Sequence, residues 1–96
     1  RNVLSFGETI VELIKSHNIG TIIGEPTSGT NGDAVIVKSP SMGYIFTGYK
    51  FLNHDGSQHH GVGVLPDIEC KQKMADVLQG EDTLINLACN LILKDK

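Results

Sequence analysis

The chain has 96 residues, 40% of them hydrophobic, and a net charge of −3 at neutral pH, which fits one small globular domain. It has only 5% aromatic residues, no Trp and no basic cluster, which argues against a nucleic-acid-binding protein. No apolar run approaches the roughly 18 residues of a membrane span, so we expect no transmembrane segment.

The first predicted element is a helix that begins just after Ser5 and ends before Gly20. Ser5 and Glu8 form the Ser-x-x-Glu pattern of a capping box, in which each side chain bonds the backbone of the other. The same placement suits a serine nucleophile at a helix N-terminus, so two readings of Ser5 stand at this point. The helix itself is predicted from the one-face spacing of Ile10, Leu13, Ile14 and His17.

A β-rich middle follows the helix. Short strands are predicted at 21–25, at 34–39 and at 44–53, where Gly48 interrupts the run, and another after Pro66. A strand that follows a helix this closely is typical of an α/β unit. Because the middle strands need partners on both edges, we doubt that this chain supplies all of them.

A second long helix closes the chain. Residues 71–79 are polar and predict a loop with a short helical turn, and Asp82 is the predicted N-cap of the helix that follows. The resulting fold class is α/β, with two helices flanking a small mixed sheet and no second domain. The apolar stripe of the helix comprises Leu84, Leu87, Ala88, Leu91 and Ile92.

Four motifs occur in a specific order. They are Ser5-x-x-Glu8 at a helix start, GEPTSGTNG at 24–32, GVGVLPDIE at 61–69 and GEDTLINLA at 80–88. In this order the chain resembles the C-terminal half of the catalytic domain of the tail-specific, or C-terminal processing, serine proteases, to which tricorn protease and the retinoid-binding repeats of the photoreceptor matrix are related. The resemblance implies a ClpP/crotonase-like fold and a catalytic domain whose upstream part is missing from residues 1–96.

The resemblance also assigns roles to the helix start. Ser5 occupies the position of the family nucleophile. The backbone N–H of Phe6 would then stabilise the oxyanion, because first-turn amides and the positive end of the helix dipole favour negative charge there. Glu8 is the supporting residue. A capping Ser and a nucleophilic Ser have nearly the same geometry, so the two readings are compatible.

The general base departs from the family pattern. Much of the family uses a Lys twenty-five positions after the Ser, where this chain has Thr30, which cannot accept a proton usefully at neutral pH. Tricorn-type relatives use a His that precedes the Ser and a supporting Glu, whose position falls near His60. We therefore carry His60, with His59 as an alternative, as the base or orienting residue. Ordinary structural roles for both also remain open, as does a base upstream.

Other site types have weaker support. His54, Asp55 and His59 could form a metal site, but ordinary structural roles for the histidines fit the sequence better, and we expect no metal or cofactor. Cys70 and Cys89 could form a disulfide, although two buried thiols fit the sequence better.

The sequence thus predicts a serine endopeptidase that cleaves protein tails or unfolded peptides. The alternative is a non-catalytic ligand-binding module on the same scaffold, like the retinoid-binding relatives. The resemblance further implies a periplasmic, cell-envelope or secreted location. We expect this piece to be inactive alone and to form homo-oligomers through exposed strand edges.

Overall fold

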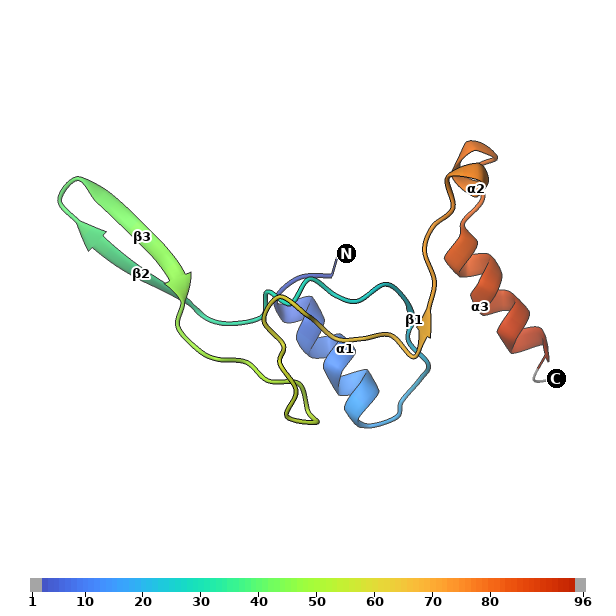
Figure 1. Ribbon diagram of the computed structural model, residues 1–96, viewed down its shortest axis with the longest axis horizontal. Helices are drawn as coiled ribbons and strands as arrows, with labels where there is room; N and C mark the ends of the chain where they lie inside the picture. The colour runs from blue at the N-terminus through green and yellow to red at the C-terminus, as the bar shows by residue number, and fades with distance from the viewer. Residues whose placement is uncertain (1–2, 95–96) are drawn as a thin grey trace.

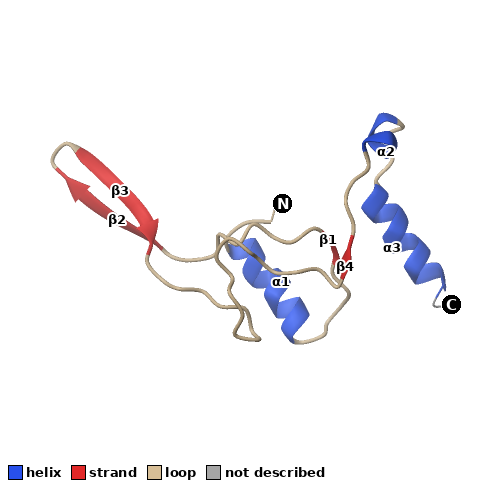
Figure 2. Ribbon diagram, in the orientation of Figure 1, coloured by secondary structure: helices blue, strands red, loops and turns tan. Residues whose placement is uncertain are grey.

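The structure is a computed structural model that describes residues 3–94. Figure 1 shows its elements in chain order, and Figure 2 separates helices from strands. The elements are α1 (Phe6–Ser16), β1 (Ile23–Gly24), β2 (Ala34–Ser39), β3 (Met42–Thr47), β4 (Ile68–Glu69), α2 (Met74–Leu78) and α3 (Thr83–Lys94).

The strands form two separate pairs. β1 and β4 pair in parallel, and β2 and β3 form an antiparallel hairpin in which Ile36 lies opposite Ile45. The α/β class is confirmed, and so is the strand at 34–39. The single mixed sheet is wrong for the described residues, because the long loops on either side of the hairpin carry it away from the β1–β4 pair (Figure 1).

Helix α1 begins and ends with identifiable signals. Ser5 is its N-cap, as predicted. At the other end Asn18, with a φ of 50°, takes the left-handed position that the sequence had suggested for Gly20. The Ile19 N–H bonds the Ile14 carbonyl and the Asn18 N–H bonds that of Lys15, which is the Schellman pattern.

The C-terminal helices also match their signals. The Asp82 carboxylate accepts the N–H groups of Leu84 and Ile85, which confirms it as the N-cap of α3. The helical turn expected within 71–79 is α2. Both cysteines are free thiols, and Cys89 is exposed, so the expectation of two buried thiols is wrong. None of the helices among residues 3–94 is long and apolar enough to cross a membrane.

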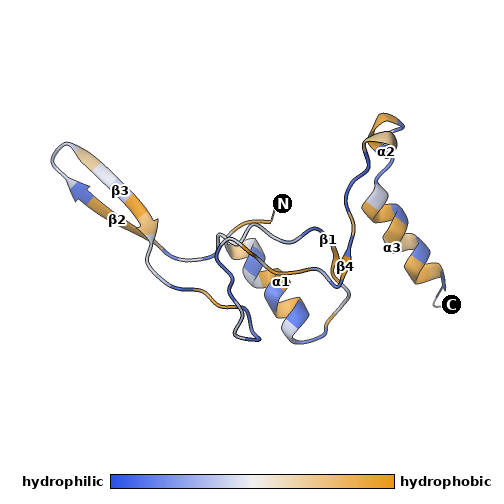
Figure 3. Cartoon of the chain, viewed as in Figure 1, coloured by the Kyte–Doolittle hydropathy of each residue, from blue (hydrophilic) through white to orange (hydrophobic). Residues whose placement is uncertain are grey.

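The described chain is extended, with an apolar surface. Its radius of gyration is 17.3 Å, whereas a compact chain of this length would have about 12.5 Å. Val64 is the one buried hydrophobic residue of the described part, and the other four buried side chains are polar. Figure 3 shows apolar stretches on the outside, most clearly on the β2–β3 hairpin. This shape suits a piece that packs against further protein.

A polar tie holds the C-terminal part of α1. The Lys15 ammonium donates to the Leu65 carbonyl and to the Asp67 carboxylate, both at 2.8 Å. Asp67 also accepts the Ile22 N–H at 2.9 Å, just before β1. The bond from Lys15 and that from Ile22 lower the pKa of Asp67. Pro66-Asp67 thus joins α1, β1 and β4.

Candidate active site

Ser5 has an unusual backbone conformation. Its φ is 48° and its ψ is −121°, a combination that residues with a Cβ rarely adopt and that costs about 1–3 kcal/mol. Its hydroxyl stands toward the Glu8 N–H in the arrangement of a capping box, but makes no cap hydrogen bond of standard geometry. Ser5 is exposed. A strained, exposed serine at a helix start is one feature of a nucleophile elbow, although no strand precedes Ser5 among residues 3–94.

Glu8 is the polar centre of this region. Its side chain is fully buried, and one oxygen accepts the Thr27 hydroxyl and the Gly29 N–H, both at 2.6 Å. The other oxygen accepts the N–H groups of Thr30, at 2.8 Å, and Ser5, at 3.0 Å, and the Thr30 hydroxyl at 3.2 Å. One carboxylate thereby joins the start of α1 to the loop at 27–31.

These donors decide the charge of Glu8. Burial alone would raise the pKa of the carboxyl, because it removes water from the charged form. The hydrogen bonds from Thr27, Gly29 and Thr30 outweigh burial and lower the pKa of Glu8 to about 2. Glu8 is therefore ionised at neutral pH and accepts, rather than donates, every bond around it.

The loop at 27–31 lies against the segment at 59–64 without intervening side chains. A Cβ at Gly29 would lie 2.6 Å from the His59 carbonyl oxygen, and one at Gly63 would overlap the Thr27 backbone. Both glycines have positive φ, 67° and 81°. The Thr27 hydroxyl also accepts the Val64 N–H at 2.8 Å. The close backbone contact therefore needs glycine at positions 29 and 63, whereas a Cβ at Gly61 would meet open space.

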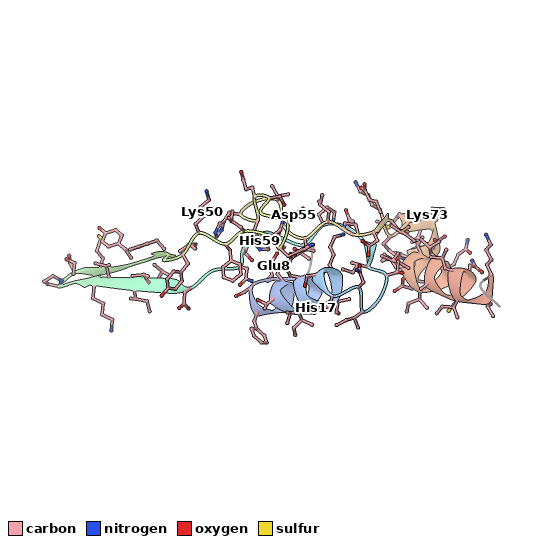
Figure 4. All side chains as sticks on the ribbon, turned by 90° about the horizontal axis from the view of Figure 1, so that it is seen from below. Glu8, His17, Lys50, Asp55, His59 and Lys73 are labelled. Atoms are coloured by element: carbon pink, nitrogen blue, oxygen red, sulfur yellow. The ribbon has the colours of Figure 1, made fainter. Side chains whose placement is uncertain are left out.

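His59 is buried next to Glu8, and Figure 4 shows the two residues one above the other, between α1 and the loops that cover it. It is 2% exposed, and its Nε2 lies 3.5 Å from a Glu8 carboxylate oxygen. Its Nδ1 lies 2.8 Å from the Asn53 side-chain oxygen. His59 therefore faces the supporting carboxylate, and no hydrogen bond joins it to Ser5 within residues 3–94.

His60 and Thr30 lie nearer the surface of the site. The His60 Nε2 accepts the Phe51 N–H at 2.9 Å, so this nitrogen is occupied. The Thr30 hydroxyl accepts the Ser5 N–H at 3.3 Å and donates to Glu8. At the position of the family lysine the chain thus has a residue that braces the Ser5 backbone. In the described part of the chain, the Ser5 hydroxyl has no hydrogen bond to an imidazole or ammonium nitrogen.

Ser5 opens onto a pocket of about 390 Å³. Its walls combine aromatic side chains with the loop that follows Thr30, and the lining residues are Ser5, Phe6, Asn31, Gly32, Asp33, Tyr49 and Phe51. A larger cavity of about 460 Å³ lies farther along α1, beside Glu12 and Lys15. We take the smaller pocket as the candidate site because it contains both Ser5 and Phe6.

The proposed metal ligands are not assembled. His54 bonds Glu12 through its backbone N–H and its Nδ1, at 2.6 and 2.7 Å. His59 instead lies against Glu8, and residues 3–94 contain no group of three His, Cys, Asp or Glu that could hold a metal ion.

Two residues of the site escaped the sequence analysis. Thr27 links Glu8 to Val64, and Asn53 holds His59. The Thr-x-Gly spacing of Thr27 and Gly29 is a local signal that could have indicated the first. Asn53 has no such signal, because its contact with His59 depends on the path of the loop between the two residues.

The comparisons with known proteins show the fold and the family of the chain. The crystal structure of the tricorn protease superposes with a TM-score of 0.75 over 97% of this chain, at 23% sequence identity, which shows a shared fold. The chain spans only 9% of that protein chain. No curated protein sequence matches. Residues 1–70 match the description "Peptidase family S41", and the chain therefore belongs to peptidase family S41.

Proposed function

We propose that the chain carries the nucleophile of a serine endopeptidase, in a ClpP/crotonase-like catalytic domain of the C-terminal processing type. The observation that carries the proposal is Ser5 itself, an exposed serine with a strained backbone at the start of α1, beside an open pocket. A side chain sealed in the interior would have left only the capping role.

The chemistry assigned to Ser5 needs three groups. Its hydroxyl oxygen attacks the peptide carbonyl, and its proton passes to a general base. Phe6 is the first residue of the helix, so its N–H has no acceptor within the helix and can donate to the oxyanion. Glu8 fixes the Ser5 backbone through the N–H bond of 3.0 Å. Since Glu8 is buried and ionised, it holds the nucleophile in place and does not take the proton.

The general base is His60 or a residue outside 3–94. His60 would first have to release the Phe51 N–H, which its Nε2 accepts. Phe51 lines the Ser5 pocket, so a bound substrate that moves it would also free the imidazole.

The pocket suits a polypeptide with an apolar residue at the cleaved position. Three aromatic side chains line it, those of Phe6, Tyr49 and Phe51. An extended segment is needed to bring a carbonyl to Ser5, so we propose unstructured protein tails as substrates. A location in the cell envelope or outside the cell belongs to the same proposal.

Covalent labelling tests the function. A fluorophosphonate probe should label the full-length protein on Ser5, and Ser5→Ala should abolish the label. Ser41→Ala, on the exposed hairpin turn, is the control that should label normally. His60→Gln should slow labelling if His60 is the base and leave it unchanged if the base lies elsewhere. Absence of label from the folded full-length protein would reject the protease.

One observation favours the non-catalytic alternative. Thr30 stands where the family has its lysine, and its hydroxyl is committed to Glu8 and the Ser5 N–H. A binding module would bind an apolar ligand in the aromatic pocket without labelling. Retained binding of such a ligand by an unlabelled full-length protein would establish this function instead.

A further inference from the structure

Asn53 fixes the proton on one side of the His59 ring. The Asn53 amide nitrogen donates to the Ser57 hydroxyl at 3.0 Å, to the Gly63 carbonyl at 3.3 Å and to the Gln58 carbonyl at 3.4 Å. The amide oxygen therefore faces His59 Nδ1, at 2.8 Å. Because a carbonyl oxygen only accepts hydrogen bonds, Nδ1 must carry the proton of this contact.

The other nitrogen of His59 faces a negative charge. Its Nε2 is buried, accepts or donates no hydrogen bond within residues 3–94, and lies 3.5 Å from Glu8 Oε2. A neutral ring with its proton on Nδ1 would aim a lone pair at an ionised carboxylate, with both side chains buried. A second proton on Nε2 would turn this repulsion into a buried ion pair.

We propose that His59 carries protons on both ring nitrogens in the folded chain and is the positioning residue for Glu8. Asn53 holds the ring on one side and the ring holds the carboxylate on the other. Glu8 in turn binds the Ser5 N–H and the amides of Gly29 and Thr30. The role of His59 thus differs from that of a general base, because it acts on Ser5 only through Glu8.

The surroundings of the ring support this charge. Glu8, on α1, is the one carboxylate in ion-pair distance of His59 within the described part of the chain. The neighbouring rings of Phe51 and His60 are T-shaped to His59, with centroids 6.0 and 6.1 Å away, and bring no negative charge of their own.

Nitrogen NMR of the histidine side chains tests the protonation directly. In the unmodified folded chain at neutral pH, both ring nitrogens of His59 should give signals of the N–H type. The exposed His17 is the internal control for the assignment of the signals. A folded chain in which His59 Nε2 is unprotonated at neutral pH would overturn the proposal.

Paired substitutions test the positioning role, which rests on the proposed function. His59→Gln retains an amide N–H that can reach Glu8, whereas His59→Leu keeps bulk without a donor. We expect Leu to lower the saturating rate of fluorophosphonate labelling about tenfold or more, with little change in the half-saturating probe concentration. Gln should restore most of the rate, and His17→Leu should not change it.

The two proposals can fail separately. An unlabelled wild-type protein with a doubly protonated His59 would reject the peptidase and retain the Glu8–His59 pair. Normal labelling of folded His59→Leu would reject the positioning role and retain the peptidase.

Discussion

The junction around Glu8 and the β2–β3 hairpin are stabilised in opposite ways. At the junction the buried side chains are polar, namely Glu8, Thr27, Asn31 and His59, and Val64 alone is apolar. In the hairpin every residue of both strands is exposed, and large apolar side chains lie on both faces. Figure 4 shows the hairpin side chains standing clear of the body.

The contrast shows which part of the chain specifies its own structure. Hydrogen bonds to one carboxylate and two close-contact glycines fix the junction without a hydrophobic core. The hairpin has only its own ladder, and an isolated hairpin is marginal in water. We therefore expect small substitutions in the junction to lower the stability of the fold. Substitutions in the hairpin should instead affect mainly its contacts with other protein surfaces.

The largest effect is expected from Gly63→Ala. The added Cβ would overlap the Thr27 backbone at a φ of 81°, so we expect a loss of roughly 3–5 kcal/mol in the free energy of unfolding. Chemical denaturation of the full-length protein measures it. Gly61→Ala has a similar φ, 76°, but open space, and should cost only about 1 kcal/mol. Equal losses would contradict the close-contact argument.

The next largest effect is a loss of folding stability in acid, caused by protonation of Glu8. Its folded pKa of about 2 lies below the ordinary value of 4.5, so the carboxylate stabilises the fold above pH 4.5. That stability, about 3 kcal/mol, is lost as the pH falls from 4.5 through about 2. The denaturation midpoint of the wild type should therefore fall as the pH is lowered across this range. Glu8→Gln should be less stable at neutral pH and show a flatter profile, and parallel profiles would count against the assignment.

A smaller effect separates backbone strain from side-chain chemistry at Ser5. Both Ser5→Gly and Ser5→Ala remove the hydroxyl and should abolish labelling. Only Gly relieves the positive φ, so we expect Ser5→Gly to be more stable than Ser5→Ala by about 1 kcal/mol. Thermal unfolding of the two variants gives the difference. Equal stabilities would mean that Ser5 is not strained.

The smallest effect on stability is expected in the hairpin. Ile45 is 71% exposed, so Ile45→Lys should change the free energy of unfolding by less than about 0.5 kcal/mol. It should nevertheless reduce the self-association that the exposed apolar strands predict. Sedimentation over a range of concentrations measures this. Ile85→Lys, on α3, is the matched control, and an equal reduction by it would move the association surface away from the hairpin.

Local signals gave the elements reliably. Ser5 and Asp82 mark the starts of α1 and α3, and the β-branched run at 34–39 is β2. These features depend on residues within one or two turns of each other. The predicted strand at 44–53 is correct only in its first part, because β3 covers Met42–Thr47 and ends at the residue before Gly48.

Long-range features were harder to predict. The division into two strand pairs depends on the paths of the loops between them. The sequence pattern of β2 and β3 also does not show against which other element these strands would pack. His59 and His60 are adjacent in sequence, yet one is buried against Glu8 and the other bonds Phe51. Their different roles follow from the Gly29–Gly63 contact, which joins segments far apart in the chain.

The two attachments of α1 determine when its serine becomes aligned. At one attachment Glu8 lies against His59. At the other, Lys15 bonds Leu65 and Asp67, which follow it by 50 and 52 positions. During synthesis, the helix must therefore emerge long before the segment that orients it. A nascent chain that stops short of residue 59 would carry the Ser5 hydroxyl without this alignment, so the reactivity proposed for Ser5 would remain latent until that stretch had left the ribosome.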